Sequence, residues 1–146
     1  MDHSFSILHD LEVDATLENV FQMVSVPEFL NEWWAHYCQG IPESDSEYTF
    51  EFSKDFIWKG KVSKLNAPYE IEFLMTEADA DWTGTKVGFI LKETENGTGI
   101  SFYHTDWKDT NDHFRKTSFC WAMYLRILRQ FVEEGLHVPY SERYHF

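Results

Sequence analysis

The feature that most constrains this chain is a change in the period of its apolar residues after His104. Between Tyr48 and His104, apolar and polar residues alternate, as in antiparallel strands with one buried and one solvent-exposed face. From Asn111 to about Glu134 the spacing becomes three and four, which predicts one amphipathic helix ended by Gly135. At ~1.5 Å per residue this helix is roughly 36 Å long, enough to cross a small sheet. The alternating segments are 48–52, 56–62, 70–75, 86–91 and, after the hairpin signal Asn96-Gly97, 100–104.

Three further elements are predicted ahead of this sheet. Near-alternating apolar residues predict a first strand over 5–13. A short helix follows, with Thr16 as its N-cap and apolar residues spaced for one face. Pro27 suits the first turn of a second short helix, which we expect Gly40 and Pro42 to end.

The order of these elements predicts an α+β fold. We expect a curved antiparallel sheet of about six strands wrapped around the long C-terminal helix, with two short helices after the first strand. The 146 residues fit a single domain over 1–146. Hydrophobic residues make up 43% and aromatic residues 18%, which is typical of a folded globule. Only the C-terminal helix is long enough to cover the apolar face of the sheet, so sheet and helix enclose a space.

The charge excludes several classes of partner. A formal net charge of -13 with no basic stripe disfavours nucleic acid and anionic membrane surfaces. No apolar run approaches the ~20 residues that span a bilayer, so we expect no membrane insertion. Residues 1–10 lack the features of a signal peptide, and two cysteines are too few for a disulfide framework. We therefore expect a cytoplasmic protein whose partners are neutral, cationic or apolar.

The residues that usually carry catalysis or metal binding show no matching pattern. The seven histidines and two cysteines lack the spacing of metal ligands, and there is no G-x-S-x-G motif. Cys120, within the long helix, reads as an inert small hydrophobe, whereas Cys38, in an expected loop, could be reactive. No helix follows Gly97-x-Gly99, so it is not a phosphate-binding loop. The sequence therefore predicts no metal site, no cofactor and no catalytic residue.

The candidate ligand-binding residues are those expected to face the enclosed space. His104 continues the inward register of its strand. If its side chain points inward, it could contact a ligand or act as a base. We prefer the alternative that His104 is half-solvated at the end of the strand. His104 or Tyr124 could fix the orientation of a ligand. Trp33 and Trp34 cannot easily both face the core, so one could line the entrance or pack under a loop. Plain core packing is the alternative for the aromatic members of the full set, which is Trp58, Phe73, Phe89, Phe102, His104, Trp121, Tyr124 and Leu125.

Several short motifs occur in an order that resembles the START-like, or helix-grip, superfamily (SRPBCC). The chain is most similar there to proteins like the activator of the heat-shock protein 90 ATPase. The resemblance covers essentially the whole chain. It is carried by Val13-Asp14-Ala15, Val20-Phe21, Phe29-Leu30, Trp33-Trp34, Trp58-Lys59-Gly60-Lys61-Val62, Gly97-Thr98-Gly99-Ile100-Ser101-Phe102, Cys120-Trp121 and Tyr124-Leu125.

The resemblance implies a cavity between the sheet and the long helix that typically holds a hydrophobic ligand. It also implies a place in the stress response with a chaperone as partner. The true co-chaperones carry an additional domain, however, so the resemblance does not imply that these 146 residues activate an ATPase.

Three hypotheses follow. The first is a non-enzymatic module that binds a small hydrophobic or lipid-like molecule. The second is a protein-interaction module for a chaperone or other protein, with an exposed apolar patch around Trp33, Trp34 and Trp107. The third is an enzyme like a cyclase or hydrolase, with His104 as its base. Residues 78–84 have no period and are interpreted as a loop; the sequence leaves open whether segment 76–84 covers the cavity.

Overall fold

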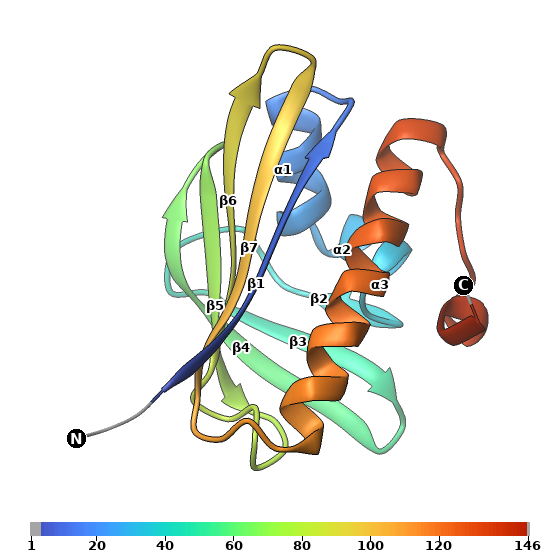
Figure 1. Ribbon diagram of the computed structural model, residues 1–146. Coiled ribbons are helices and arrows are strands. Elements are labelled where there is room, and N and C mark those ends of the chain that lie inside the picture. Colours follow the sequence, from blue (N-terminus) through green and yellow to red (C-terminus); the bar gives the residue numbers. More distant parts are fainter. Residues whose placement is uncertain (1–3, 146) are drawn as a thin grey trace.

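A seven-stranded antiparallel sheet curves around one long helix in the computed structural model, which describes residues 4–145 (Figure 1). The strands are β1 (Phe5–Val13), β2 (Tyr37–Gln39), β3 (Glu47–Ser53), β4 (Phe56–Asn66), β5 (Glu70–Glu77), β6 (Lys86–Thr94) and β7 (Gly97–Trp107). The helices are α1 (Leu17–Ser25), α2 (Pro27–Trp33), α3 (Asp112–Glu134) and a C-terminal 3₁₀ helix, η1 (Tyr140–His145). None of the helices among the described residues is long and apolar enough to cross a membrane.

The strand order is β1-β7-β6-β5-β4-β3-β2, and every neighbouring pair is antiparallel. Helix α3 lies across one face of the sheet, and α1 and α2 lie on the same side (Figure 1). The predicted α+β helix-grip fold is thereby confirmed. The strand beyond the expected six is β2 (Tyr37–Gln39), where no strand was expected; α2 ends at Trp33, ahead of Gly40 and Pro42.

The start of α1 and both ends of α3 are set by local sequence, as predicted. The Thr16 side chain accepts a hydrogen bond from the backbone N–H of Asn19 and so caps α1. Asn111 caps α3 in the same way, through the N–H of Phe114 at 2.9 Å. Gly135 ends α3 with φ 68°, a left-handed conformation that glycine adopts without steric penalty.

Trp33 and Trp34 are both buried, so the expectation that they could not easily share the core is wrong. Trp33 donates from Nε1 to the carbonyl of Met23 at 2.8 Å, and its ring meets the ring of Phe89 edge-on. Trp34 packs instead on Phe50, with ring centroids 4.7 Å apart. Both fit because Trp34 follows the last residue of α2, where the helical spacing no longer fixes the direction of its side chain.

Candidate functional site

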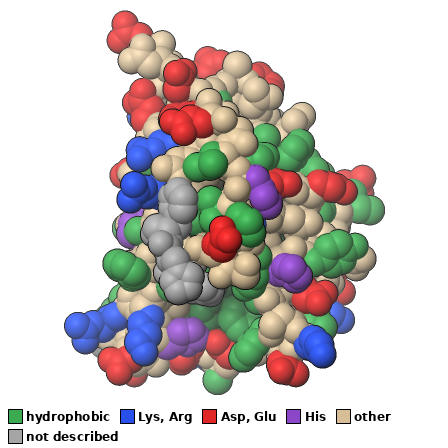
Figure 2. Space-filling view, turned by 90° about the vertical axis from the view of Figure 1, so that its right-hand side faces the viewer, with side chains coloured by type: hydrophobic (Ala, Val, Ile, Leu, Met, Phe, Trp, Pro, Cys, Tyr) green, Lys and Arg blue, Asp and Glu red, His purple; other side chains and the backbone are tan. Residues whose placement is uncertain are grey.

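A pocket of about 470 Å³ lies between the first turns of α3, the β3–β4 hairpin and the loop that joins β5 to β6. It opens on the face shown in Figure 2, where hydrophobic side chains form the floor of a hollow. We call it the aromatic pocket, because eight of its fourteen lining residues are Trp, Phe or Tyr. The lining residues are Trp34, Phe52, Ser53, Phe56, Trp58, Asp79, Trp82, His113, Lys116, Thr117, Cys120, Trp121, Tyr124 and Tyr140.

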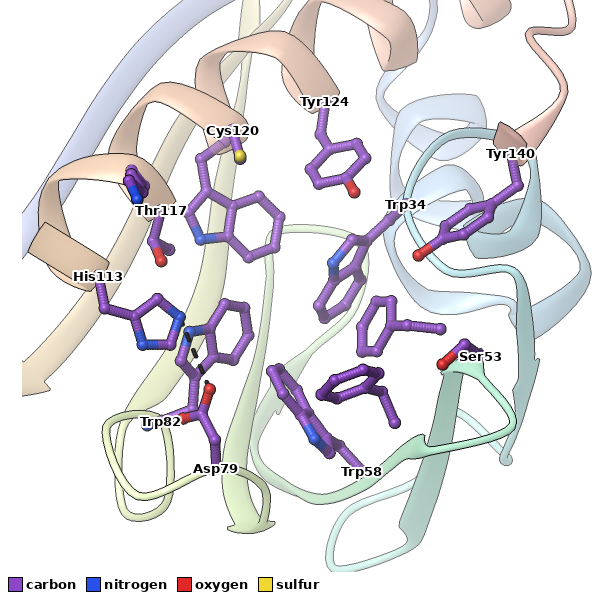
Figure 3. Close-up of a pocket in the computed structure, with 14 residues that line it drawn as sticks. Trp34, Ser53, Trp58, Asp79, Trp82, His113, Thr117, Cys120, Tyr124 and Tyr140 are labelled. Carbon is purple, nitrogen blue, oxygen red and sulfur yellow. Dashed lines mark hydrogen bonds and ion pairs between the residues drawn. The ribbon is translucent and has the colours of Figure 1, made fainter. Parts of the chain in front are cut away.

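One face of α3 forms the longest wall of the pocket. The lining residues of α3 recur at helical spacing, so their side chains lie on one face of the helix: His113, Thr117, Cys120, Trp121 and Tyr124. Figure 3 shows His113, Thr117 and Tyr124 on the pocket side of α3. Thr117, Trp121 and Tyr124 are buried, whereas Cys120 and His113 are half-buried. This wall therefore changes from polar near the start of α3 to aromatic further along the helix.

The opposite wall comes from the β3–β4 hairpin. The rings of Phe52 and Trp58 meet edge-on with centroids 5.2 Å apart, and Phe52 also contacts Trp34 at 6.1 Å. Trp58 continues to Trp82 at 4.9 Å, and Trp82 stacks on Trp121 at 6.0 Å. The indoles thus form a continuous aromatic lining from the hairpin to α3 (Figure 3). Aromatic pairs in such offset or edge-on arrangements are mutually stabilising.

The loop between β5 and β6 closes one end of the pocket, and the loop expected over 78–84 is confirmed. Oδ1 of Asp79 accepts hydrogen bonds from the backbone N–H groups of Asp81 and Trp82 at 3.1 and 2.8 Å, which fixes the turn. The Asp81 carboxylate bonds His113 Nδ1 at 2.8 Å and accepts from Asn111 Nδ2 at 3.4 Å. The hydrogen bond from His113 lowers the pKa of Asp81. These bonds attach the loop to the first turn of α3.

Tyr140 of η1 lines the pocket beside Trp34, and Arg143 holds η1 in place. The guanidinium of Arg143 is buried and donates from Nη2 to the carbonyl of Asn31 at 2.6 Å. It also donates from Nη1 to the carbonyls of Trp34 and Ala35 at 3.1 and 3.3 Å. These carbonyls lie at the C-terminus of α2, where the helix dipole favours a cation. No local sequence pattern indicates this anchor, because Arg143 and the carbonyls that it binds lie more than a hundred residues apart.

His104 is fully buried and does not line the pocket, so the half-solvated position preferred from the sequence is wrong. The rings of Trp82 and Trp121 pack against it, with centroids at 4.5 and 6.1 Å. Its Nδ1 accepts from Trp121 Nε1, and its Nε2 bonds the Thr85 hydroxyl. Burial lowers its pKa to about 3. A base with both nitrogens engaged, a low pKa and no access to the pocket does not suit the third hypothesis.

The other predicted site residues fall into two groups. Trp58, Trp121 and Tyr124 line the pocket, and that they contact a ligand stays a prediction. Phe73, Phe89, Phe102 and Leu125 belong to the packed core instead. Their part of the sheet is filled because α1 and α2 pack there, so the pocket occupies only one end of the space between sheet and α3. The apolar patch expected around Trp33, Trp34 and Trp107 is absent, since all three side chains are buried.

Sequence reasoning missed several lining residues. Trp82 and Asp79 lie in a segment whose apolar residues show no regular spacing, so no sequence pattern indicated that they line the pocket. His113, Thr117 and Cys120 have the helical spacing that places them on the same face as Trp121, and this spacing could have predicted that they line the pocket. Among the side chains of residues 4–143, no group of three or more His, Cys, Asp or Glu is placed to hold a metal ion.

Cys38 lies in β2 and is buried, not in a loop as expected. Burial, reinforced by the charge of Glu28, raises the pKa of the Cys38 thiol to about 12. A thiol of that pKa is unreactive near neutral pH. Cys120 is half-buried in the pocket wall, and burial raises its pKa as well.

The long α3 held by a curved sheet, the two short helices after β1 and the pocket at one end together define a helix-grip protein of the START-like (SRPBCC) class. Residues 14–133 match the family described as Activator of Hsp90 ATPase homolog 1-like protein, and the chain belongs to that family.

Solved structures agree with this assignment. The Aha1 dimer from Colwellia psychrerythraea is 26% identical, with a TM-score of 0.82 over 90% of this chain and 98% of that chain. A protein from Bacillus halodurans is 25% identical, with a TM-score of 0.74 over 88% of this chain and 97% of that chain. One from Staphylococcus saprophyticus, 20% identical, shares the fold with a TM-score of 0.76 over 92% and 96%. No curated protein matches the sequence.

Proposed function

We propose that this protein binds a small hydrophobic molecule in the aromatic pocket without transforming it. The observation that carries the proposal is an unfilled space of about 470 Å³ walled mainly by aromatic rings. Pockets for small molecules usually measure ~300–1,000 Å³ and combine apolar walls with a few polar groups. The four indoles of Trp34, Trp58, Trp82 and Trp121 favour an aromatic ligand, because an aromatic ring can stack offset or meet them edge-on. Each apolar group that a ligand buries contributes roughly 1.5–3 kcal/mol.

The six tryptophans allow a direct test by NMR. We would titrate 15N-labelled protein with 2-methoxynaphthalene and follow the six indole N–H signals. The signals of Trp34, Trp58, Trp82 and Trp121 are expected to shift with one common affinity. Those of Trp33 and Trp107, which do not line the pocket but pack on rings that do, are expected to shift less and serve as internal references. Native mass spectrometry of freshly purified protein would show any ligand that is retained from the cell.

A pair of variants on α3 provides the matched control. Cys120→Trp places a large side chain in the pocket, whereas Phe119→Trp changes a neighbouring residue that is 76% exposed. The first variant is expected to lose binding and the second to retain it. Equal binding by both variants, or indole shifts spread over all six tryptophans, would contradict the pocket as the binding site.

A second candidate function is the binding of a chaperone in the stress response. Family membership supports it, and so does an exposed apolar row at the edge of the sheet that we call the hairpin patch. Tyr37 of β2 and Ile57 of β4 flank Glu51 of β3 in one cross-strand row. Tyr37 and Ile57 are 48% and 51% exposed. A cluster of exposed apolar residues is typical of a protein contact.

Calorimetry with purified Hsp90 would test this candidate. Tyr37→Ser combined with Ile57→Ser removes the hairpin patch and leaves the pocket lining unchanged. The wild type is expected to bind and this double variant to bind at least tenfold more weakly. Ile90→Ser, at another exposed apolar position on β6, is the control. Absence of binding by the wild type would reject Hsp90 as the partner.

A further inference from the structure

The aromatic pocket has one polar corner, and its first member is Thr117 on α3. The Thr117 side chain lines the pocket although the residue is only 6% exposed. Figure 3 shows its hydroxyl oxygen turned toward the His113 side of the pocket. Within the described part of the chain no hydrogen bond to this hydroxyl is present, and its oxygen is not one of the fully buried unpaired atoms, so it is open to the pocket. A hydroxyl both donates and accepts, so it is able to pair with a polar ligand atom there.

The second member of the corner is the Asp79 carboxylate. Its Oδ1 is occupied by the backbone N–H groups of Asp81 and Trp82. Its Oδ2 lies 3.6 Å from His113 Nε2, within ion-pair range but too far for a hydrogen bond, so it keeps its capacity to accept one. Asp79 lines the pocket with its side chain 35% exposed, so Oδ2 is able to accept a hydrogen bond from a ligand. Sequence spacing alone does not bring Asp79 near Thr117; the attachment of the loop to α3 does.

The charges around this corner select among polar ligand groups. Asp79 and Asp81 place two carboxylates there, and His113 already forms its hydrogen bond with Asp81. Lys116 lies on the exposed side of the rim, where solvent screens its charge. The chain as a whole carries a formal net charge of -13. An anionic group at the corner would therefore meet Asp79 directly, whereas a neutral donor would find an acceptor.

We propose that the ligand is a flat aromatic molecule that carries a hydrogen-bond donor, a hydroxyl or an amino group, placed between Asp79 and Thr117. This inference rests on the proposed function, and it names the chemical class of the ligand and its orientation. The ligand hydroxyl donates to Oδ2 of Asp79, and the Thr117 hydroxyl donates to the ligand oxygen. The aromatic body extends from the corner toward Trp58 and Trp34.

Three probes of matched shape test the inference on the wild-type protein. 2-Naphthol carries a donor, 2-methoxynaphthalene keeps the oxygen without the donor, and 2-naphthoate carries a negative charge. By calorimetry, 2-naphthol is expected to bind about tenfold more tightly than its methyl ether, because hydrogen bonds to charged acceptors are the stronger kind. 2-Naphthoate is expected to bind most weakly. Equal affinities, or a preference for 2-naphthoate, would overturn the inference and leave the proposed function standing. Binding of none of the probes would overturn both.

Variants of Thr117 and Asp79 test whether these two residues cause the preference for 2-naphthol. Thr117→Val keeps the shape of the side chain without its hydroxyl, and Asp79→Asn keeps the Oδ1 acceptor that fixes the turn. Both are expected to reduce the preference for 2-naphthol over its methyl ether to about twofold or less. Ser53→Ala removes a hydroxyl from another part of the lining and is expected to retain the full preference. Thermal unfolding of each variant verifies that it is folded. A full preference in both corner variants would overturn the inference.

Discussion

The indole Nε1–H of Trp121 donates a hydrogen bond to Nδ1 of His104 across 3.1 Å, and so joins α3 to β7 behind the aromatic pocket. With Nδ1 accepting, the ring carries its proton on Nε2, which donates to the Thr85 hydroxyl at 2.8 Å. That hydroxyl donates in turn to the carbonyl of Trp82 at 2.6 Å. The line of hydrogen bonds therefore runs from one pocket wall to the loop that closes the pocket.

Replacement of His104 should destabilise the protein. In His104→Leu the Trp121 N–H remains buried without an acceptor, and we expect the free energy of unfolding to fall by about 1–3 kcal/mol. Urea unfolding followed by tryptophan fluorescence measures this change. His137→Leu, which removes only an exposed ion pair with Glu32, is the control and should change stability by less than about 1 kcal/mol. Equal effects of the two variants would contradict the role of the buried network.

The same residue should make stability depend on pH. The pKa of His104 is about 3 in the folded protein and near its ordinary value of 6.5 in the unfolded chain. Between these values the unfolded chain binds the extra proton, so stability decreases as pH falls from about 6.5 toward 3, by up to about 1.4 kcal/mol per pH unit. His104→Gln removes this contribution. Free energies of unfolding measured from pH 7 to pH 4 should therefore fall less steeply in the variant; parallel curves would disprove the assignment.

The position of η1 should depend on Arg143. In Arg143→Met the hydrogen bonds to the carbonyls at the end of α2 are lost, and η1 should detach. The freed carbonyls regain water, so we expect a loss of about 1.5–3 kcal/mol. Amide hydrogen exchange in residues 138–143 should accelerate, while exchange in β5 and β6 stays slow. Arg129→Met removes an exposed cation on α3 and should leave both the free energy of unfolding and the amide exchange rates unchanged.

The outer face of the sheet depends on Gly88. A Cβ there would overlap the Tyr103 ring, whose hydroxyl donates to the buried carboxylate of Glu72. Gly88→Ala should therefore displace the ring and lower the free energy of unfolding by about 1–3 kcal/mol. Gly99→Ala, where the nearest atom lies at 3.4 Å, should change it little.

A double-variant cycle separates this overlap from other effects of the substitution. In a Tyr103→Ala background the obstacle to a Cβ at Gly88 is gone, so the second substitution should cost much less than it does alone. Urea unfolding of the four proteins gives the coupling energy. Simple additivity would show that Tyr103 is not the obstacle.

The two thiols should differ in reactivity. Cys38 is 4% exposed with a pKa of about 12, so a disulfide reagent at neutral pH should reach it only after unfolding. Cys120 is half-buried in the pocket wall and should react slowly in the folded state, and more slowly still when 2-naphthol is present. Counting labelled thiols by mass spectrometry, with Cys120→Ser as control, tests this. Reaction of Cys38 in the folded protein would contradict its burial.

Much of the fold was predictable because its signals are local. Alternation between Tyr48 and His104 specifies strands with one buried face, and Asn111 and Gly135 bound α3 through their own backbone hydrogen bonds and conformation. Strand β2 was not predicted, because three residues are too few to show an alternating pattern. Its partner β3 provides the hydrogen bonds that make it a strand.

By itself, then, the sequence determined the class of fold and the buried faces, since period and capping act between residues a few positions apart. Only the tertiary structure decided where space remains. Helices α1 and α2 fill one end of the sheet and bury Phe89, whereas the other end stays open. There, a loop without pattern brings Trp82 and Asp79 against α3, and Arg143 brings Tyr140. A pocket is the volume that packed elements leave unfilled, so its lining depends on contacts between distant segments that no local pattern encodes.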